Sequence, residues 1–473
     1  MEFETVIGLE IHCELSTETK IFCSCKTDFG AEPNMNICPV CTGLPGALPV
    51  LNGKAVQYAV KAGLALNCKI SDEIVFDRKN YFYPDLPKAY QISQLYKPLC
   101  QEGFLDICGG KKRIGIREIH MEEDAGKLIH GRDRTLIDYN RAGVPLIEIV
   151  TYPDFSGSEE VTEFLEKLKA ILMYTGVSDC KMQEGSLRVD VNLSVREKGA
   201  KILGERTETK NLNSFRSVRL AVEFEENRQK TELLKGNKII SSTIHWDDAK
   251  CVGTVMRPKE NISQYRYFPE PDILPIPLDY KWIEEIRRTI PELPEERENR
   301  YKSEYALTDY EAKNICASKT LADIFETLCH LTNNPKESAN WILGEVLRLY
   351  SVSGKDAEDY SFSAEKLAFI INKLQRGEIN RGTAKELFEE VFSNDADPET
   401  LISERGLEVI KDDSVIENAV CKVISENKKS VEELKAGKTK VEKFLIGMVM
   451  KELKGKGDPS KIVEILKKCI EKT

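Results

Sequence analysis

The feature that most constrains the fold is a change of hydrophobic period near residues 270–296, where prolines cluster. On its N-terminal side, polar and apolar residues alternate in 5–12 and 187–195, which is typical of strands with one polar face. On its C-terminal side, almost every segment repeats apolar residues with the 3.6-residue period of amphipathic helices. The chain is therefore predicted to be α+β, with a mostly antiparallel sheet followed by helices.

Two domain boundaries are predicted where breaker residues fall between periodic segments. They give a sheet-containing domain over 1–292, an all-helical domain over 293–400 and a small helical tail domain over 401–473. Ser158 and Ser363 each precede an amphipathic run, so both are predicted to cap helices.

Composition argues against two classes of protein. No run approaches the ~20 apolar residues that a membrane helix needs, and the N-terminus lacks the basic-then-apolar layout of a signal peptide. Ten of the fourteen cysteines are scattered singly, which suits reduced, buried thiols rather than a disulfide framework. We therefore expect a cytoplasmic protein that does not bind membranes.

The other four cysteines have the spacing C-x-C, twelve residues, C-x-x-C. They are Cys23, Cys25, Cys38 and Cys41. Two close pairs separated by a loop let four thiolates converge on a tetrahedral Zn²⁺, forming a zinc knuckle over 23–41. One alternative is a redox dithiol, which would leave the first pair unexplained; the other is four unrelated buried thiols. A zinc held by four protein ligands would stabilise the loop and leave no position for substrate.

Several predicted strands carry polar residues where a buried face is expected. Glu10 and His12 are two positions apart in an extended stretch, so they share one face. Further candidates are Glu122 and Glu123 in HMEED, Asp190 in LRVDVN and Glu208 in TETK. Carboxylates from several strands, with one imidazole, would form an oxygen-rich site for Mg²⁺ or a similar hard cation. The alternative is that each acid lines a solvated sheet face.

Two stretches, 78–93 and 257–272, interleave aromatic and basic residues. Such mixtures suit contact with a nucleotide or single-stranded RNA, and a packed surface loop is equally consistent. The candidate cofactor-binding residues are Lys79, Tyr81, Lys88 and Lys210. No Walker loop and no kinase Gly-rich loop occurs in the sequence, so ATP use cannot be inferred from a local motif.

The C-terminal end is basic although the whole chain has a net charge of −10. Residues 426–473 contain 13 lysines and 8 acidic residues. A role in binding a polyanion is therefore best sought in this tail.

Together these segments resemble the GatB family, whose members belong to tRNA-dependent amidotransferases. The matching stretches include VIGLEIHCEL, FGAEPN, CPVCTGLPGALPVLN, KNYFYPDLPKAYQISQ, IHMEEDAGKL, DYNRAGVPLIEIV, GSLRVDVNLSVR, TKNLNSF and YRYFPEPD. The resemblance covers essentially the whole chain, and motifs this long and ordered are very specific.

The resemblance implies a heterotrimer with an amidase subunit (GatA) and a small subunit (GatC). In this heterotrimer the GatB chain uses ATP and Mg²⁺ to phosphorylate the side-chain carboxylate of glutamate on tRNA(Gln) or of aspartate on tRNA(Asn). Ammonia that the amidase subunit releases from glutamine then displaces the phosphate, giving Gln-tRNA(Gln) or Asn-tRNA(Asn). The implied fold is a cradle domain with the kinase site, followed by a helical domain and a tail domain that bind tRNA.

Carried over by motif, the resemblance assigns the Mg²⁺ and phosphoryl-transfer site to the acidic candidates. These are Glu10, His12, Glu122, Glu123, Asp190 and Glu208. It also makes the four cysteines a structural zinc site. Candidate contacts to tRNA phosphates are Lys435, Lys438, Lys440, Lys451 and Lys454, for which a solvated helix face is the alternative.

The sequence departs from the family pattern at Ala89, where glycine is usual, and at 243–247, which lacks an expected arginine-containing stretch. The second departure puts the substrate or nucleotide contacts there in doubt. Two other functions were weighed: a non-catalytic tRNA-binding scaffold and a free-standing zinc protein that binds nucleic acid. The acidic candidates favour the enzyme, because a scaffold has no reason to hold buried acids.

Overall fold

The computed structural model describes residues 2–258, 265–410, 412–435, 440–453 and 455–472. Contacts divide the chain into two units, Met1–Glu296 and Arg297–Thr473. This division falls within helix α5 (Pro294–Glu304), close to the predicted boundary at 292. The three predicted domain ranges themselves stay predictions.

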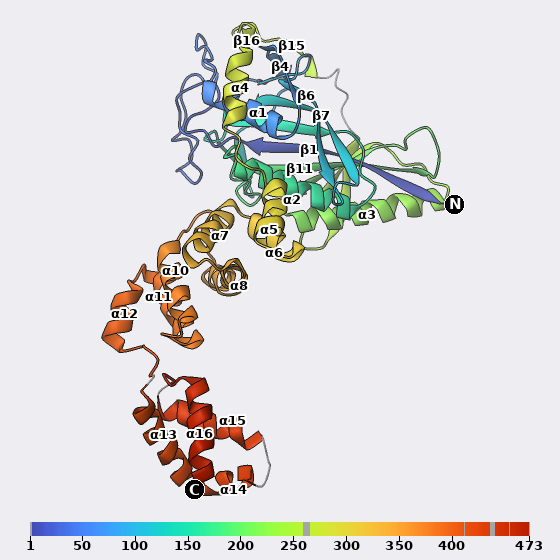
Figure 1. Cartoon of the computed structure of the whole chain (residues 1–473). Helices are drawn as coiled ribbons and strands as arrows, with labels where there is room; N and C mark the ends of the chain where they lie inside the picture. Colours follow the sequence, from blue (N-terminus) through green and yellow to red (C-terminus); the bar gives the residue numbers. More distant parts are fainter. Residues whose placement is uncertain (1, 259–264, 411, 436–439, 454, 473) are drawn as a thin grey trace. The chain divides into compact units, whose positions relative to one another are not determined.

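The first unit is built on a sheet with the strand order β14-β13-β12-β11-β1-β10-β7-β6-β2 (Figure 1). Its strands are β1 (Phe3–Glu14), β2 (Lys69–Ile70), β6 (Cys100–Ile107), β7 (Lys112–Glu123), β10 (Pro145–Thr151), β11 (Leu187–Glu197), β12 (Thr207–Leu212), β13 (Ser242–Asp247) and β14 (Val252–Pro258). All neighbouring strands pair antiparallel except β12 and β13, which are parallel. The predicted α+β class is confirmed.

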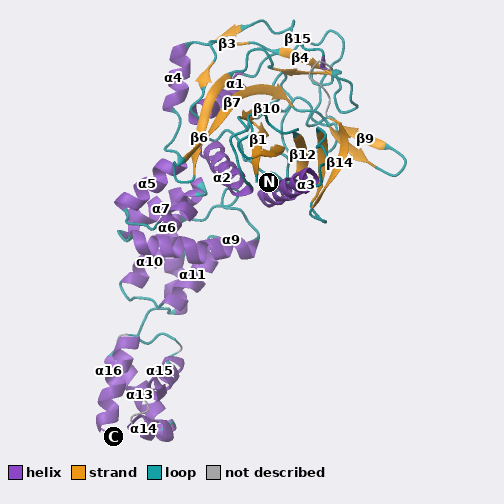
Figure 2. Cartoon of the chain, turned by 90° about the vertical axis from the view of Figure 1, so that its right-hand side faces the viewer, coloured by secondary structure: helices purple, strands orange, loops and turns teal. Residues whose placement is uncertain are grey.

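Short strands and helices complete this unit (Figure 2). The smaller sheets are formed by β15 (Phe268–Pro269), β4 (Asp77–Asn80) and β5 (Tyr90–Ser93), by β16 (Ile276–Pro277) and β3 (Glu73–Ile74), and by β8 (Lys127–His130) and β9 (Thr135–Asp138). The helices are α1 (Gly53–Ala65), α2 (Ser158–Tyr174), α3 (Phe215–Leu234) and α4 (Tyr280–Arg288).

One face of the large sheet is apolar and forms the core. The odd positions of β1, Ile7, Leu9 and Ile11, are at most 1% exposed and pack in one cluster with apolar residues of α1, α2 and α3. Because side chains alternate along a strand, the even positions of β1 face the other side of the sheet. The same alternation that buries the core therefore creates a separate polar face.

The second unit is helical. Its helices are α6 (Asp309–Cys316), α7 (Lys319–Thr332), α8 (Pro335–Trp341), the π-helical turn η2 (Ile342–Val346), α9 (Leu347–Ser353), α10 (Ala364–Gln375), α11 (Arg381–Asn394), α12 (Pro398–Arg405), α13 (Asp413–Glu426), α14 (Lys428–Lys435), α15 (Lys440–Glu452) and α16 (Pro459–Lys472). Apolar side chains form two clusters, one between Tyr301 and Ile402 and the other between Ile416 and Leu466. The predicted boundary near 400 lies close to the gap between them.

The two predicted helix caps differ in outcome. Ser363 caps α10, because its hydroxyl accepts the N–H of Lys366 at 3.2 Å. The prediction for Ser158 is wrong: Gly157 is the N-cap residue of α2, and the Ser158 hydroxyl donates to Glu223 at 3.1 Å. Across the described ranges, no helix combines the length and apolar character needed to cross a membrane.

Candidate active site

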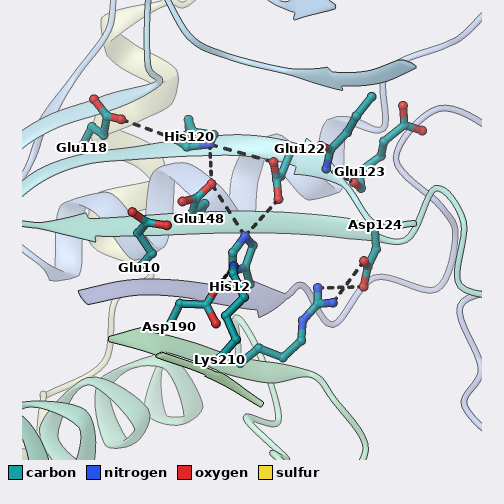
Figure 3. Close-up of polar contacts among 12 residues, drawn as sticks. Glu10, His12, Glu118, His120, Glu122, Glu123, Asp124, Glu148, Asp190 and Lys210 are labelled. Carbon is teal, nitrogen blue, oxygen red and sulfur yellow. Dashed lines mark hydrogen bonds and ion pairs between the residues drawn. The ribbon is translucent and has the colours of Figure 1, made fainter. Parts of the chain in front are cut away.

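The polar face of the large sheet collects acidic and imidazole side chains from neighbouring strands (Figure 3). Strand pairing sets His12 of β1 opposite Glu148 of β10, and Glu148 opposite His120 of β7. On the other side of β1, Glu10 is paired with Asp190 of β11. Because directly opposed residues have Cβ atoms about 5 Å apart, the register itself assembles the site.

One group of possible metal ligands consists of His12, Glu122 and Glu148, whose ligand atoms lie within 4.8 Å of one another. His12 Nε2 is 3.5 Å from Glu122 Oε1 and 3.7 Å from Glu148 Oε2. Burial acts to lower the pKa of His120, but Glu148, 3.0 Å away, and Glu122 outweigh it and raise that pKa to about 9. The protonated His120 therefore supplies positive charge beside this group.

A second group consists of Glu10, Asp190 and Glu208, also with ligand atoms within 4.8 Å of one another. Lys210 Nζ lies 2.5 Å from Asp190 Oδ2 and 3.3 Å from Glu208 Oε1. Burial acts to lower the pKa of Lys210, but these two carboxylates hold it above its ordinary value. Asn192 donates to Glu10 at 3.0 Å and orients that carboxylate.

Both groups offer the donors that a hard cation such as Mg²⁺ prefers, mainly carboxylate oxygens. The donor sets therefore fit Mg²⁺, and they fit it as two neighbouring groups rather than as the single set that the sequence predicted.

Glu123 belongs to neither group, which corrects its prediction as a ligand beside Glu122. Successive residues of a strand point to opposite faces, so Glu122 faces His12 while Glu123 points away (Figure 3). Glu123 instead pairs with Lys88 and accepts the N–H of Ile92 at 2.9 Å. Lys88 and Glu123 line a cavity of about 230 Å³ together with residues of the cysteine loop. The structure thus separates Lys88 from the two ligand groups.

Lys79 and Tyr81, by contrast, belong near the first group. Lys79 Nζ lies 5.8 Å from the centre of the Tyr81 ring and 5.0 Å from that of Tyr265. Burial acts to lower the pKa of Lys79, but Glu122, Tyr267 and Glu148 raise it above its ordinary value. Burial likewise raises the pKa of Tyr81. Lys79 therefore carries a charge that the carboxylates of this group stabilise.

Sequence reasoning missed Glu148 and His120. Glu148 is the only polar residue in the run Pro145–Val150, and a lone acid in a buried strand was the available signal. His120 precedes Glu122 by two positions, so the alternation that pairs Glu10 with His12 also places His120 on the polar face.

The four cysteines lie together in the loop between β1 and α1, with their Sγ atoms within 4.8 Å of one another. The Sγ atoms of Cys38 and Cys41 are 3.9 Å apart, close to the edge of about 3.8 Å that four Zn–S bonds of ~2.3 Å give a tetrahedron. Hydrogen bonding with Cys23, despite burial, and the Cys38 N–H lower the pKa of Cys41 to about 4. The thiols fit Zn²⁺. A redox dithiol is disfavoured, because no strand or helix adjoins Cys38 and Cys41 among the described residues.

The predicted lysines of the tail are only partly described. Lys438 and Lys454 lie outside the described residues. Lys435 ends α14 and Lys440 begins α15, and Lys451 is exposed on α15.

Comparison with known proteins identifies the family. Residues 5–284 match the family model described as the GatB/GatE catalytic domain, and residues 323–470 match the model described as the GatB domain. The chain belongs to the GatB family. The resemblance seen in the sequence is thus confirmed, and both ligand groups lie within the catalytic-domain match.

Curated GatB relatives match over their whole length. The chain is 55% identical over 479 residues to the GatB protein of the aspartyl/glutamyl-tRNA(Asn/Gln) amidotransferase of Caldicellulosiruptor bescii, covering 100% of both chains. It is 52% identical to the proteins of the same name from Lachnoclostridium phytofermentans, covering 99% of each chain, and Thermoanaerobacter pseudethanolicus, covering 100% of each.

Proposed function

We propose that this GatB chain is the subunit of a glutamine-dependent ligase that activates and amidates glutamate on tRNA(Gln), aspartate on tRNA(Asn), or both. Membership in the family supports the role. The observation that carries the site assignment is the pair of ligand groups on one sheet face, His12 with Glu122 and Glu148, and Glu10 with Asp190 and Glu208.

The reaction has two steps. In the first, a side-chain carboxylate oxygen of the aminoacyl group attacks the γ-phosphorus of ATP, an O–P bond forms, and the bond from that phosphorus to the bridging oxygen of ADP breaks. The carboxylate is already ionised near pH ~7, so this step needs no general base. In the second step, ammonia attacks the acyl carbon, the C–O bond to phosphate breaks, and one proton passes from nitrogen to the departing phosphate.

The chain's residues hold and orient the reactants. His12, Glu122 and Glu148 would hold one Mg²⁺, and Glu10, Asp190 and Glu208 a second. When bound, Mg²⁺ neutralises phosphate charge and orients the γ-phosphate.

Lys79 and Lys210 supply positive charge beside the two groups. They are the cationic side chains that we assign to the ATP phosphates. Tyr81 lies beside Lys79 as part of the same proposed ATP site.

We further propose that the chain works in a cytoplasmic heterotrimer with an amidase subunit and a small subunit. The amidase supplies the ammonia that the second step consumes. The lysines of the tail, Lys435, Lys438, Lys440, Lys451 and Lys454, would contact tRNA phosphates.

The test is co-expression with both partner subunits, followed by assays of ATP cleavage and amidation with each mischarged tRNA. Glu10→Gln and Asp190→Asn should abolish Mg²⁺-dependent ATP cleavage while tRNA binding persists. Glu4→Gln is the matched control, because Glu4 lies on the same strand and pairs with Arg196. Unchanged ATP turnover in both site variants would contradict the site, and a wild-type complex without ATP cleavage would favour the scaffold.

A further inference from the structure

Lys20 is a fully buried lysine beside the cysteine cluster. Its side chain is 0% exposed, and Nζ lies 3.7 Å from Cys41 Sγ and 3.3 Å from the carbonyl oxygen of Tyr139. In the part of the chain that the structure describes, no carboxylate lies within 4.0 Å of this ammonium. A buried charge needs a partner of opposite sign, and of these two contacts of Nζ only the thiolate of the cluster can carry one.

The fold fixes this contact from both sides. The backbone N–H of Lys20 donates to the carbonyl of Cys25 at 2.9 Å, so Lys20 is tied to the cysteine loop. The turn at Gly143 packs on the same spot, since a Cβ added there would lie 3.5 Å from both Lys20 Cδ and Cys41 Cβ. Ile21 donates to Gly143 at 2.9 Å and holds that turn in place. The ammonium therefore has one direction to point, toward Cys41.

The charge count gives this geometry a role. Four thiolates around one Zn²⁺ carry a net charge of −2, and a buried net charge is costly. One ammonium halves that charge, and its N–H donates to the sulfur of Cys41. Groups that hydrogen-bond to a metal's ligands typically change metal affinity by about 10–100-fold.

We propose that Lys20 is the built-in counter-charge of a tetrathiolate zinc site, which slows the release of zinc and shields the Cys41 thiolate from electrophiles. Lys20 acts through Cys41 and is a positioning residue. The assignment is independent of the carboxylate groups on the sheet, so it can fail without the proposed function failing.

The experiment measures zinc release from the full-length, zinc-loaded chain to the chromogenic chelator 4-(2-pyridylazo)resorcinol. Lys20→Met keeps the length of the side chain and removes its charge, so zinc should leave about 10–100-fold faster. Lys20→Arg keeps the charge and should stay within about threefold of wild type. Lys26→Met is the control, because Lys26 lies in the same loop but is exposed and pairs with Asp28.

A second readout follows the thiol itself. Alkylation of Cys41 by N-ethylmaleimide in the zinc-loaded chain, followed by mass spectrometry, should be faster in Lys20→Met than in wild type and unchanged in Lys26→Met. If Lys20→Met does not fold, Lys20→Gln replaces it, because the amide keeps a donor without the charge.

Three results would overturn the proposal. Zinc release from a folded Lys20→Met chain at the wild-type rate would make Lys20 a packing residue only. Release from Lys20→Arg as fast as from Lys20→Met would show that shape, not charge, matters. A purified wild-type chain that binds no added zinc would remove the site itself.

Discussion

Glu148 Oε2 lies 3.0 Å from His120 Nε2 across the β10–β7 strand pair. The same oxygen is 3.7 Å from His12 Nε2 on the other neighbouring strand, β1. Glu148 thus joins three strands at the centre of the polar face (Figure 3). Burial acts to raise the pKa of Glu148, but His120 and His12 hold it far below its ordinary range. Glu148 is therefore ionised and available to a cation.

Replacing Glu148 should disable the site without unfolding the sheet. Glu148→Gln removes one charged ligand, so Mg²⁺-dependent ATP cleavage by the assembled complex should fall by about 100-fold or more. Glu118→Gln is the matched control, because Glu118 also faces His120, at 3.9 Å, but belongs to neither ligand group. Activity of Glu148→Gln within about threefold of wild type would contradict its role as a ligand.

Glu14 should make stability depend on pH. Burial and the nearby charge of Asp124 raise the pKa of Glu14 from 4.5 to about 8. Between these values the folded chain keeps a proton that the unfolded chain has lost, so the free energy of unfolding falls as the pH rises through this window.

Glu14→Gln should remove that loss, adding on the order of 2 kcal/mol at pH ~8.5 and little at pH ~4. Urea unfolding of the full chain at both values measures the difference. Glu205→Gln, at an exposed loop position, is the control. An equal effect of Glu14→Gln at both pH values would contradict the prediction.

Ala89 departs from the family's glycine at a position where the backbone favours glycine. Its φ is +60°, in the left-handed region, and the side chain is exposed. Relief of this strain exceeds the extra flexibility of glycine in the unfolded chain, so Ala89→Gly should stabilise the chain by about 0.5–1 kcal/mol. Denaturant midpoints test this. Ala31→Gly, at a loop position without a positive φ, should destabilise instead, and destabilisation by Ala89→Gly would refute the account.

Local pattern predicted more of this fold than of its site. Alternation in 5–12 and 187–195 was sufficient to predict β1, β11 and the polar face, because a period of two fixes which side chains point together. Cysteine spacing likewise predicted the convergence of four thiols, since both pairs are short-range.

Strand register was not available from the sequence. The pairing of His12 with Glu148 joins strands far apart in the chain, and no local pattern specifies such a partner. For the adjacent acids Glu122 and Glu123, a shift by one residue exchanges the two faces. The phase of β7 decided between them, and sequence reasoning placed both on the same side.

The tail should supply a salt-dependent part of tRNA affinity. Replacing Lys435, Lys438, Lys440, Lys451 and Lys454 by alanine should weaken binding about tenfold or more at low salt. The slope of log affinity against log salt should become shallower by up to about 4. Lys422 and Lys468 are matched controls, because both are exposed lysines of the tail already paired with Glu452 and Glu464. Equal slopes in the five-lysine and control variants would refute the tail's role.

The number of bound Mn²⁺ ions, measured by electron paramagnetic resonance on the full-length chain, tests the central claim most directly. Mn²⁺ serves as the probe for Mg²⁺, because both prefer oxygen ligands. If the two ligand groups are two cation sites, wild type binds two ions, Glu148→Gln loses one and Asp190→Asn loses the other. Binding of two ions by both variants with wild-type affinity would contradict the account.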